Sequence, residues 1–452
     1  MRVILDIPLS INDVLFAVNA KHASSSDGFI RAICTDTREA EAGDLFIALP
    51  GNGNNGESYV DSALKNGCYV LSSNNRSDVF FVDDTVNALL HLAKFYKSIL
   101  NPQYTVAVTG SVGKSTTVKF ISKILGAEYK VHSPIGNFNN HLGVPLTVLS
   151  APRDTEILVL ELGMNRQGEI ARLSECIAPD MGIITSIGTA HIGNLGSREE
   201  IARAKLEILN GMNGGNLILP KSEPLLLGVE NALYVSRTSS LSHFYFHRSN
   251  IAYVLTSPYG TIENICFFDD REHLLDDLSL AVSAAQAIGM SNVSILKGVR
   301  AINENDLRQR FIEIDDFTVF DDSYNSSLES VTADLKYIIS FKRPTGAFLG
   351  DILELGEMSD SIHEQIGLNA ARLGIGHLYL FGRFAQHVAK GAVKGGMKEC
   401  NIYINTNVSA PELSVEQILK NHARGEIILF KASHKLRFDK IADTIKELKM
   451  YE

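Results

Sequence analysis

Two stretches of this chain show a regular alternation of apolar, strand-like runs and helical patterns. In the first stretch, short apolar runs typical of buried strands lie at residues 105–108, 156–162 and 181–187, and a helical pattern covers 114–125. Apolar runs of this kind, separated by helices, indicate a parallel sheet with helices packed on it. The pattern therefore predicts an α/β unit with a central parallel sheet.

The second stretch begins at Phe317 and runs to the end of the chain. Helical segments separate its strand candidates, and a last helix is expected over 436–448. The five strand candidates lie at residues 317–321, 346–349, 377–381, 401–404 and 426–430. This order is typical of a second α/β unit of the doubly wound type.

The remaining stretches are less regular. The N-terminal part has strand-like runs at 44–49 and 68–72 and a helix at 85–100, after which Asn101-Pro102 breaks the pattern. Residues 222–270 are weakly patterned. Two expected helices follow them, at 276–288 and 293–301.

These patterns predict an α/β fold with three domains. Their expected limits are 1–100, 101–303 and 304–452. A chain of 452 residues is too long to form a single core, which agrees with this division.

Composition narrows the range of functions. Apolar residues make up 45% and charged residues 21%, as in ordinary soluble globular proteins. The net charge of -10 argues against a nucleic-acid binder, because nucleic-acid binding needs a surplus of Lys and Arg facing phosphate. An anionic small molecule remains possible, since a basic pocket can lie in an acidic protein.

The cysteines and the apolar runs indicate a cytoplasmic protein. The five cysteines are scattered and form no CxxC pair, as expected for reduced thiols rather than disulfides or a zinc site. Residues 1–10 lack a signal-peptide pattern, and no apolar run is long enough for a membrane span.

The strongest chemical signal is a loop between the strand at 105–108 and the helix at 114–125. It reads Gly110-Ser111-Val112-Gly113-Lys114-Ser115-Thr116. Glycines let backbone N–H groups turn toward phosphate oxygens, Lys114 adds positive charge, and Ser115 can reach Mg²⁺. Val108 stands where the full Walker pattern has its first glycine, so the loop is a short variant. It predicts phosphate binding, against the alternative of a structural turn.

Two further side chains are expected at the same edge of the sheet. Glu161 ends an apolar strand and is well placed for Mg²⁺, although a strand-end acid can also simply face solvent. His191 follows the strand at 181–187. A lone histidine is as often a loop residue as a ligand, so its role stays open on this pattern alone.

Lys205 lies on the apolar side of an expected helix. Ser197 and Glu200 form an S-x-x-E start signal for this helix, which is expected to run through Leu209. Burying a charged lysine costs on the order of several kcal/mol unless the lysine is paired or neutral. The alternative is a lysine whose stem alone is buried.

A group of asparagines precedes the apolar segment that begins near Leu142. Asn137, Asn139 and Asn140 offer amides suited to a polar ligand, but asparagines are also common in plain turns.

Long motifs in all three parts of the chain make the sequence resemble the Mur ligase family. They include TGSVGKST (109–116), GNFNNHLGVPLT (136–147), ELGMNRQGEI (161–170) and TSIGTAHIGNLGSREEIARAKLEI (185–208). Others are TDTREAEAGDLFIALPG (35–51), DDSYNSS (321–327), GDILELGE (350–357) and KASHKLRFDKI (431–441). Their lengths and order make the resemblance far more specific than the phosphate loop alone.

The resemblance implies a domain for the UDP end of a precursor, a central ATP domain and a C-terminal Rossmann-like domain. It implies that Lys114 holds ATP phosphates, that Glu161 and His191 ligate Mg²⁺, and that Lys205 is a lysine carbamylated in several members. Thr37 and Arg38 would lie near the uridine diphosphate, and Asn139 and Asn140 near substrate. The third domain would approach the nucleotide and the reacting groups through Arg308, Asp322, Tyr324 and Asn325.

The implied activity is ATP-dependent amide-bond formation in peptidoglycan precursor synthesis. The motifs are most similar to those of the branch that joins D-alanyl-D-alanine to UDP-N-acetylmuramoyl-tripeptide through an acyl phosphate. The protein is expected to be a monomer. The sequence departs from the family at Asn54-Asn55-Gly56-Glu57, usually an Asp-Gly-His run. It also departs at Lys221-Ser222-Glu223 and at Asp277, on the adenine side.

Two alternatives remain. One is another amide ligase of the same family, either the enzyme that adds the third residue or a folylpolyglutamate-type enzyme. The other is a catalytically silent ATP-binding module, which would be expected to lack the phosphate-loop lysine or the metal carboxylate. Both residues, Lys114 and Glu161, are present.

Overall fold

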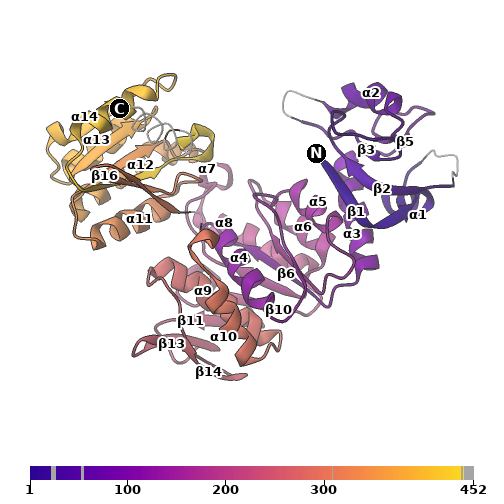
Figure 1. Ribbon diagram of the computed structural model, residues 1–452, viewed down its shortest axis with the longest axis horizontal. Helices are drawn as coiled ribbons and strands as arrows, with labels where there is room; N and C mark the ends of the chain where they lie inside the picture. The colour runs from indigo at the N-terminus through magenta and orange to yellow at the C-terminus, as the bar shows by residue number, and fades with distance from the viewer. Residues whose placement is uncertain (22–26, 52–54, 308, 439–440, 442–452) are drawn as a thin grey trace.

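The chain forms three sheets that follow one another along the sequence. The computed structural model describes residues 1–21, 27–51, 55–307, 309–438 and 441. The sheets have five, nine and six strands and are covered by helices. Figure 1 shows them as three groups, with the central one between the N-terminal and C-terminal groups. This is the expected α/β fold with three domains.

The N-terminal sheet has one antiparallel edge strand and four strands that run parallel. In order across the sheet they are β1 (Arg2–Ser10), β2 (Phe29–Cys34), β3 (Leu45–Ile47), β4 (Tyr69–Ser72) and β5 (Phe80–Phe81). Helices α1 (Ile11–Val18) and α2 (Val60–Lys65) accompany them. Both strands predicted here, at 44–49 and 68–72, are confirmed with shorter bounds.

Helix α3 (Thr85–Leu100) joins the N-terminal sheet to the central domain. Asp84 begins it by accepting hydrogen bonds from the Val86 and Asn87 amides, and the predicted bounds are confirmed. The helix packs against α1 on one side and against α5 (Gly143–Leu149) and α6 (Glu169–Ile177) on the other. Its buried face therefore belongs to both units.

The central sheet is parallel except at one edge. Its order is β14, β13, β12, β11, β10, β9, β6, β8, β7. The strands span Tyr104–Thr109 (β6), Val131–His132 (β7), Ile157–Glu161 (β8), Met181–Ile184 (β9), Asn216–Pro220 (β10), Ala232–Ser236 (β11), Phe244–Ser249 (β12), Ala252–Ser257 (β13) and Gly260–Ile265 (β14). Strand β13 pairs antiparallel with both β12 and β14, and the other pairs of the sheet described here are parallel.

Helices cover this sheet as the apolar pattern predicted. They are α4 (Lys114–Leu125), α5, α6, α7 (Ile192–Leu195), α8 (Arg198–Leu206), α9 (Glu272–Ala287) and α10 (Asn292–Ala301). Helices α4, α9 and α10 pack together on one face (Figure 1). The weakly patterned stretch 222–270 proves to hold four strands, β11 to β14, which the sequence did not predict.

The third sheet has the order β15, β16, β20, β17, β18, β19. Its strands span Arg310–Ile314 (β15), Phe317–Asp321 (β16), Thr345–Gly350 (β17), His377–Phe381 (β18), Ile402–Asn405 (β19) and Glu426–Lys431 (β20). All five predicted strands are confirmed, and the antiparallel edge strand β15 is an addition. The helix expected at 436–448 falls mostly outside the described residues.

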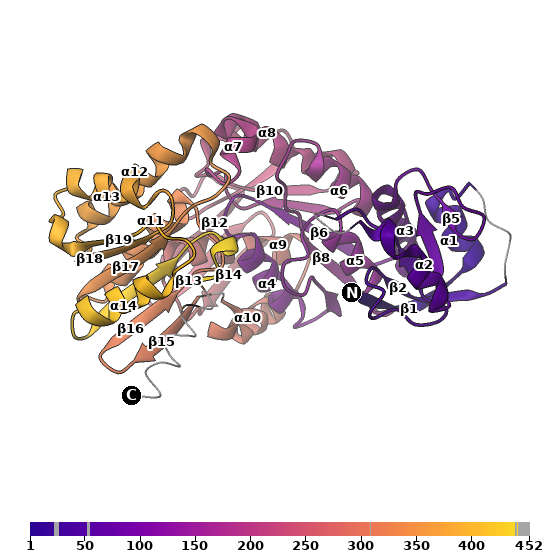
Figure 2. The same cartoon turned by 90° about the horizontal axis from the view of Figure 1, so that it is seen from above.

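Helices lie on both faces of the third sheet. They are α11 (Leu328–Ser340), α12 (Ser359–Leu373), α13 (Ala385–Lys394) and α14 (Glu412–Asn421). Figure 2 shows α12 and α13 on one side of the strands and α14 on the other. This is the Rossmann-like, doubly wound arrangement, in which ligands bind at the carboxyl ends of the parallel strands.

Candidate active site

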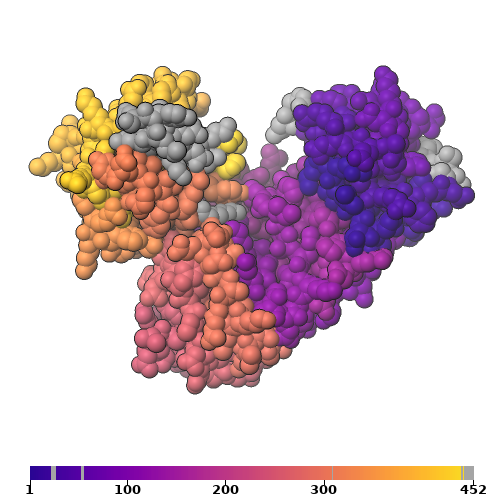
Figure 3. Space-filling model, viewed as in Figure 1, coloured from indigo at the N-terminus to yellow at the C-terminus, as the bar shows by residue number. Residues whose placement is uncertain are grey.

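A single large cavity receives residues from all three domains. Its volume is about 1170 Å³. Its walls include the segments that follow β6, β8 and β9 of the central sheet, the segment that follows β16 of the third, and Lys431 at the end of β20. Figure 3 shows the hollow between the N-terminal and C-terminal parts, above the central domain. The carboxyl ends of two parallel sheets thus face one site.

The predicted phosphate loop lies between β6 and α4. Gly110 and Gly113 have φ values of 153° and 89°, which glycine tolerates best. A Cβ atom would lie 1.9 Å from Thr185 Oγ1 at Gly110 and 2.3 Å from Asp277 Oδ1 at Gly113. Both positions therefore require glycine for space as well as for conformation.

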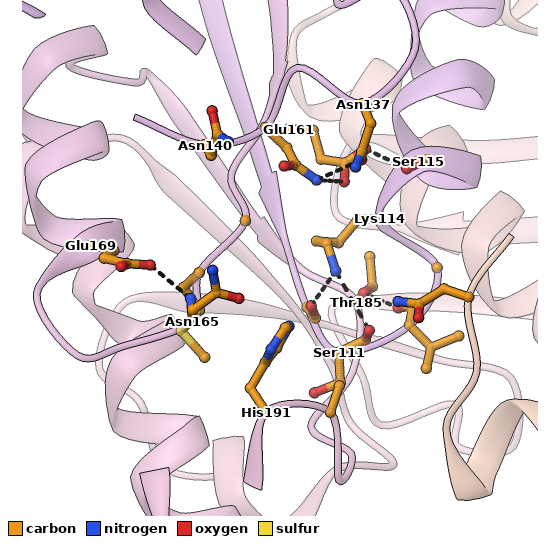
Figure 4. A pocket seen from close by; sticks show the side chains of 18 of the residues that line it. Ser111, Lys114, Ser115, Asn137, Asn140, Glu161, Asn165, Glu169, Thr185 and His191 are labelled. Atoms are coloured by element: carbon orange, nitrogen blue, oxygen red, sulfur yellow. Dashed lines mark hydrogen bonds between the residues drawn. The ribbon is translucent and has the colours of Figure 1, made fainter. Parts of the chain in front are cut away.

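Ser186 and Lys114 shape the same loop. The Ser111 amide donates to the Ser186 carbonyl at 2.9 Å, and the Val112 amide donates to Ser186 Oγ at 3.0 Å. Lys114 Nζ donates to the Gly110 carbonyl at 2.8 Å. The lysine thus lies across the loop, at the start of α4, where a phosphate group would meet its charge (Figure 4).

Glu161 lies beside the loop, at the end of β8. Its side chain is buried; Ser115 Oγ donates to Oε2, and Asn139 Nδ2 donates to Oε1 at 2.8 Å. A hydroxyl and a carboxylate next to a phosphate loop are the oxygen donors that Mg²⁺ prefers. Ser115 and Glu161 therefore fit the ion that the family implies.

Asn140 contributes differently from Asn139. Asn140 Oδ1 accepts hydrogen bonds from the amides of Leu142 and Gly143, at 3.0 and 2.9 Å, and so holds the turn that leads into α5. Both asparagines line the cavity, as does Asn137, whose Oδ1 accepts from Asn139 Nδ2 at 2.9 Å.

His191 lines the cavity, but its ring contacts Glu354 and not Glu161. Its Nδ1 lies 2.6 Å from Oε2 of Glu354, which belongs to the third domain. Burial lowers the pKa of the imidazole, and Glu354 opposes this shift. In Figure 4, His191 lies on one side of Lys114, and Ser115 and Glu161 lie on the other. Among the described residues, no three His, Cys, Asp or Glu side chains gather as a metal cluster.

Lys205 is wholly buried on α8, with 2% of its surface exposed. Burial, and next the charge of Lys114, lower the pKa of this amine well below its ordinary value. No carboxylate pairs with it in the described part of the chain. Burial of the whole side chain removes the alternative of a buried stem with an exposed amine. Ser197 caps the helix, as predicted, but α8 ends at Leu206 and continues as a 3-10 turn.

The third domain brings Asp322, Tyr324 and Asn325 to the cavity, as expected. Behind Asp322 lies a buried group that the sequence did not predict. Lys431 Nζ bonds Asp322 Oδ2 and lies 2.8 Å from Asp334 Oδ2. These residues stand far apart in the chain, so no local pattern could reveal the group. Arg308 lies outside the described residues.

Thr37 and Arg38 do not line the cavity. Arg38 is 87% exposed at its side chain and pairs with Asp36, and the Thr37 carbonyl accepts a hydrogen bond from Asn66 at 3.1 Å. The N-terminal wall is built instead by residues near Asn55, Glu57 and Ser73. Glu57 accepts hydrogen bonds from Ser72 Oγ at 2.6 Å and from the Ser73 amide at 2.8 Å. Of the departing run 54–57, Asn54 lies outside the described residues.

Asp277 and His273 complete the wall formed by α9. Thr117 Oγ1 donates to Asp277 Oδ1 at 3.0 Å, and burial raises the pKa of this carboxyl well above its ordinary value. Burial lowers the pKa of His273 to about 4. The imidazole of His273 is therefore neutral at pH 7, and burial favours the protonated form of the Asp277 carboxyl.

Comparison with known proteins agrees with this architecture. The model of the Mur ligase middle domain matches residues 108–264. A UDP-N-acetylmuramoyl-tripeptide–D-alanyl-D-alanine ligase of Bacillus subtilis is 35% identical over 92% of this chain and 93% of its own. A crystal structure of MurF from Acinetobacter baumannii covers 98% of this chain and 100% of its own, with a TM-score of 0.88 and 26% identity.

A further solved structure resembles the chain in fold. It is the MurF ligase of Thermotoga maritima in complex with ADP, with a TM-score of 0.76 and 23% identity. It covers 93% of this chain and 98% of its own. With this full-length similarity and the three-domain site described above, the chain belongs to the Mur ligase family.

Proposed function

We propose that the chain is an ATP-dependent ligase that joins D-alanyl-D-alanine to UDP-N-acetylmuramoyl-tripeptide. The observation that carries the chemistry is the phosphate loop opening onto a cavity that all three domains line. A reaction with three substrates needs such a meeting point, because most of its acceleration comes from alignment and charge neutralisation. The similarity to the Bacillus subtilis ligase supports the choice of substrates.

The first step transfers the γ-phosphate of ATP to the terminal carboxylate of the tripeptide. A carboxylate oxygen attacks the γ-phosphorus, the bond to the β-phosphate oxygen breaks, and ADP leaves. Lys114 lies on the loop and supplies positive charge to the transferred group. The amine of the dipeptide then attacks the acyl carbon, loses a proton, and phosphate leaves with the electrons of the broken C–O bond.

Mg²⁺ is proposed at the side of the loop where Ser115 and Glu161 meet. The ion would neutralise phosphate charge when bound. Ser115 Oγ and Glu161 Oε2 already contact each other there, and Asn139 holds the second carboxylate oxygen. His191 is proposed as a further ligand of the ion; it lies on the other side of Lys114, and Glu354 holds its ring.

Lys205 is proposed to carry a carbamate. Burial and the charge of Lys114 lower the pKa of the Lys205 amine and so favour the neutral form, which could attack CO2 and lose a proton, giving an anion near Lys114. This fits the electrostatics, since Lys114 already disfavours a second cation there. Density for the added carboxyl group, in crystals grown with bicarbonate, would support it; an unmodified lysine in the fully active enzyme would remove it.

The substrate proposal is tested by measuring phosphate release. With ATP and UDP-N-acetylmuramoyl-tripeptide, turnover is expected with D-alanyl-D-alanine and not with diaminopimelate, lysine or glutamate. Lys114→Ala should lower turnover by about 10²–10³-fold. Lys123→Ala is the matched control, because Lys123 lies on the same helix but pairs with Asp306 outside the cavity.

Each rival has its own outcome in this assay. Turnover with another amine and none with the dipeptide would indicate another amide ligase of the family. ATP binding without consumption under any substrate combination would indicate a silent ATP-binding module. The cytoplasmic location and monomeric state expected from the sequence stay predictions. No helix in the described part of the chain is both long and apolar enough to span a membrane.

A further inference from the structure

Two carboxylates of the third domain reach the loop that carries His191. Glu329, in the first turn of α11, accepts from the Thr189 amide at 3.0 Å and from Thr189 Oγ1 at 3.1 Å. Glu354, in the loop after β17, lies 2.6 Å from His191 Nδ1. Two separate segments of the third domain thus hold the same few residues of the central domain.

The backbones of the two loops also lie in close contact. The Gly193 amide donates to the Glu354 carbonyl at 3.0 Å. A Cβ atom at Gly193 would lie 2.4 Å from the Gly356 nitrogen, and one at Gly188 would lie 3.1 Å from the Glu329 carboxyl group. Glycines at 188 and 193 therefore permit an approach that larger residues would prevent.

The two residues of this pair, His191 and Glu354, share an uncommon backbone conformation. His191 and Glu354 both have φ of 65°, in the left-handed region that residues with a Cβ rarely adopt. Such a conformation is strained and persists where surrounding contacts impose it. Both residues lie where the two loops contact each other, so this contact is the one that imposes the conformation on both.

We propose that Glu329 and Glu354 are positioning residues that couple docking of the third domain to the orientation of His191. When Nδ1–H donates to a carboxylate, the ring is fixed and Nε2 keeps its lone pair as a ligand. Nε2 is then the nitrogen left for the cavity that Lys114 lines. The part concerning the metal rests on the proposed function; the docking itself does not.

This coupling gives a role to the motif Gly350–Glu357. Asp351 accepts from the amides of Arg383 and Phe384, at 2.9 and 3.0 Å, and so anchors the start of the motif within the third domain. Glu354 and Gly356, three and five residues later, make the contact with the central domain. The motif connects the third sheet to the loop of His191.

The first test measures the tautomer of His191 without any ligand. In full-length protein labelled with ¹⁵N-histidine, the side-chain resonance of His191 is assigned by its loss in His191→Gln. We expect a proton on Nδ1 in the wild type and a shift toward the Nε2–H form in Glu354→Ala. Glu357→Ala is the matched control, since Glu357 lies on the same loop and has no partner among the described residues. An unchanged tautomer in Glu354→Ala would overturn the role of Glu354.

The second test measures the docking of the domains. Cys266 of the central domain and Cys400 of the third are exposed, whereas the other three cysteines are buried, so spin labels can be attached to the native chain. We expect a narrow distance distribution in the wild type and in Glu357→Ala. Glu329→Ala should broaden it, and Glu329→Gln, which keeps one acceptor oxygen for the Thr189 amide, should broaden it less. Identical distributions in all variants would overturn the coupling.

Kinetics then separate this inference from the proposed function. Glu354→Ala should weaken activation by Mg²⁺ by about 10–100-fold, as for other residues that orient a metal ligand, while Glu357→Ala should not change it. Wild-type protein that shows the expected tautomer and distances but no ligation would refute the function alone. Ligation with unchanged tautomer and distances would refute the coupling alone.

Discussion

Two buried lysines line the same cavity, one in the central domain and one in the third. Lys205 and Lys431 are 2% and 1% exposed. Lys431 contacts Asp322 and Asp334, whereas no carboxylate pairs with Lys205 in the part of the chain that the structure describes. Burial alone would lower the pKa of both amines. At Lys431 the two aspartates outweigh burial, so its pKa is raised. At Lys205 the charge of Lys114 adds to burial and lowers the pKa further.

The difference shows how a protein can use the same buried group in two ways. Taking an ammonium out of water costs several kcal/mol, roughly, and this must be offset by partners or avoided by losing the proton. The partners of Lys431 make it a fixed cation that holds two carboxylates. Lys205 has no carboxylate partner among the described residues, so its lowered pKa favours the neutral amine, which is the nucleophilic form.

The largest effect is expected when the paired lysine is removed. Lys431→Met would leave Asp322 and Asp334 without a cation, and breaking a buried pair in this way costs about 3–5 kcal/mol. Hydrogen exchange of peptides from β20 and α11 should report this loss of stability locally, which avoids assuming that three domains unfold as one.

A double-mutant comparison controls for the change in packing. In an Asp322→Asn, Asp334→Asn background, Lys431→Met should destabilise far less, because no carboxylate is left unpaired. Equal losses in both backgrounds would mean that Lys431 matters only for its volume.

The opposite outcome is expected for the unpaired lysine. Lys205→Met should keep or increase stability, because it removes an amine that has no carboxylate partner. Turnover should nevertheless fall by about 10²–10³-fold if the amine or its carbamate stabilises the reacting phosphate. Stability and phosphate release are measured on the same preparation. Unchanged turnover would refute a catalytic role for Lys205.

The sequence could predict what depends on neighbours in the chain. Helix 85–100 and strands 317–321 and 377–381 were predicted with their observed bounds, because apolar runs end at clear caps and turns. The phosphate loop and Glu161 followed from the same local order of strand, loop and helix.

What was missed depends on contacts between distant segments. Strand β14 buries only Ile262 and Ile265, so pairing with β13 rather than an apolar pattern defines it. Lys431 lies 109 residues from Asp322, and no local signal joins them. Similarly, Thr37 and Arg38 were expected near substrate from resemblance alone, and the structure places neither at the cavity.

A third prediction uses pH to separate the two lysines. The pKa of Lys205 is lower in the folded chain than in the unfolded chain, near 10.5, so the unfolded state binds more protons between these two values. Stability of the wild type relative to Lys205→Met should therefore rise with pH, by up to about 1.4 kcal/mol per unit in that window.

Lys431 should behave in the opposite way. Its raised pKa means that its contribution is complete below about 10.5, the unfolded value, and is lost as pH rises through the folded value. Between pH 7 and 9.5 the contribution of Lys431 should therefore stay constant, while that of Lys205 changes. Denaturant unfolding over this range, in buffers free of CO2 so that no carbamate forms, measures the difference between wild type and Lys205→Met. A flat difference between wild type and Lys205→Met would mean that Lys205 is not neutral in the folded state.

The smallest effect is expected at one of the two aspartates that hold Lys431. Burial raises the pKa of Asp334 well above its ordinary value. At Asp322 the charge of Lys431 and the hydrogen bonds with Asp334, Lys431 and Gln309 together outweigh burial and lower the pKa. These opposite shifts favour the proton on Asp334 and the charge on Asp322. Asp334→Asn keeps the shape of the carboxyl that favours the protonated form, so it should cost about 1 kcal/mol or less. Asp322→Asn removes the charge that Lys431 needs and should cost more, by about 1–3 kcal/mol. Hydrogen exchange of β20 compares the two variants directly, and equal losses would show that both aspartates share the charge.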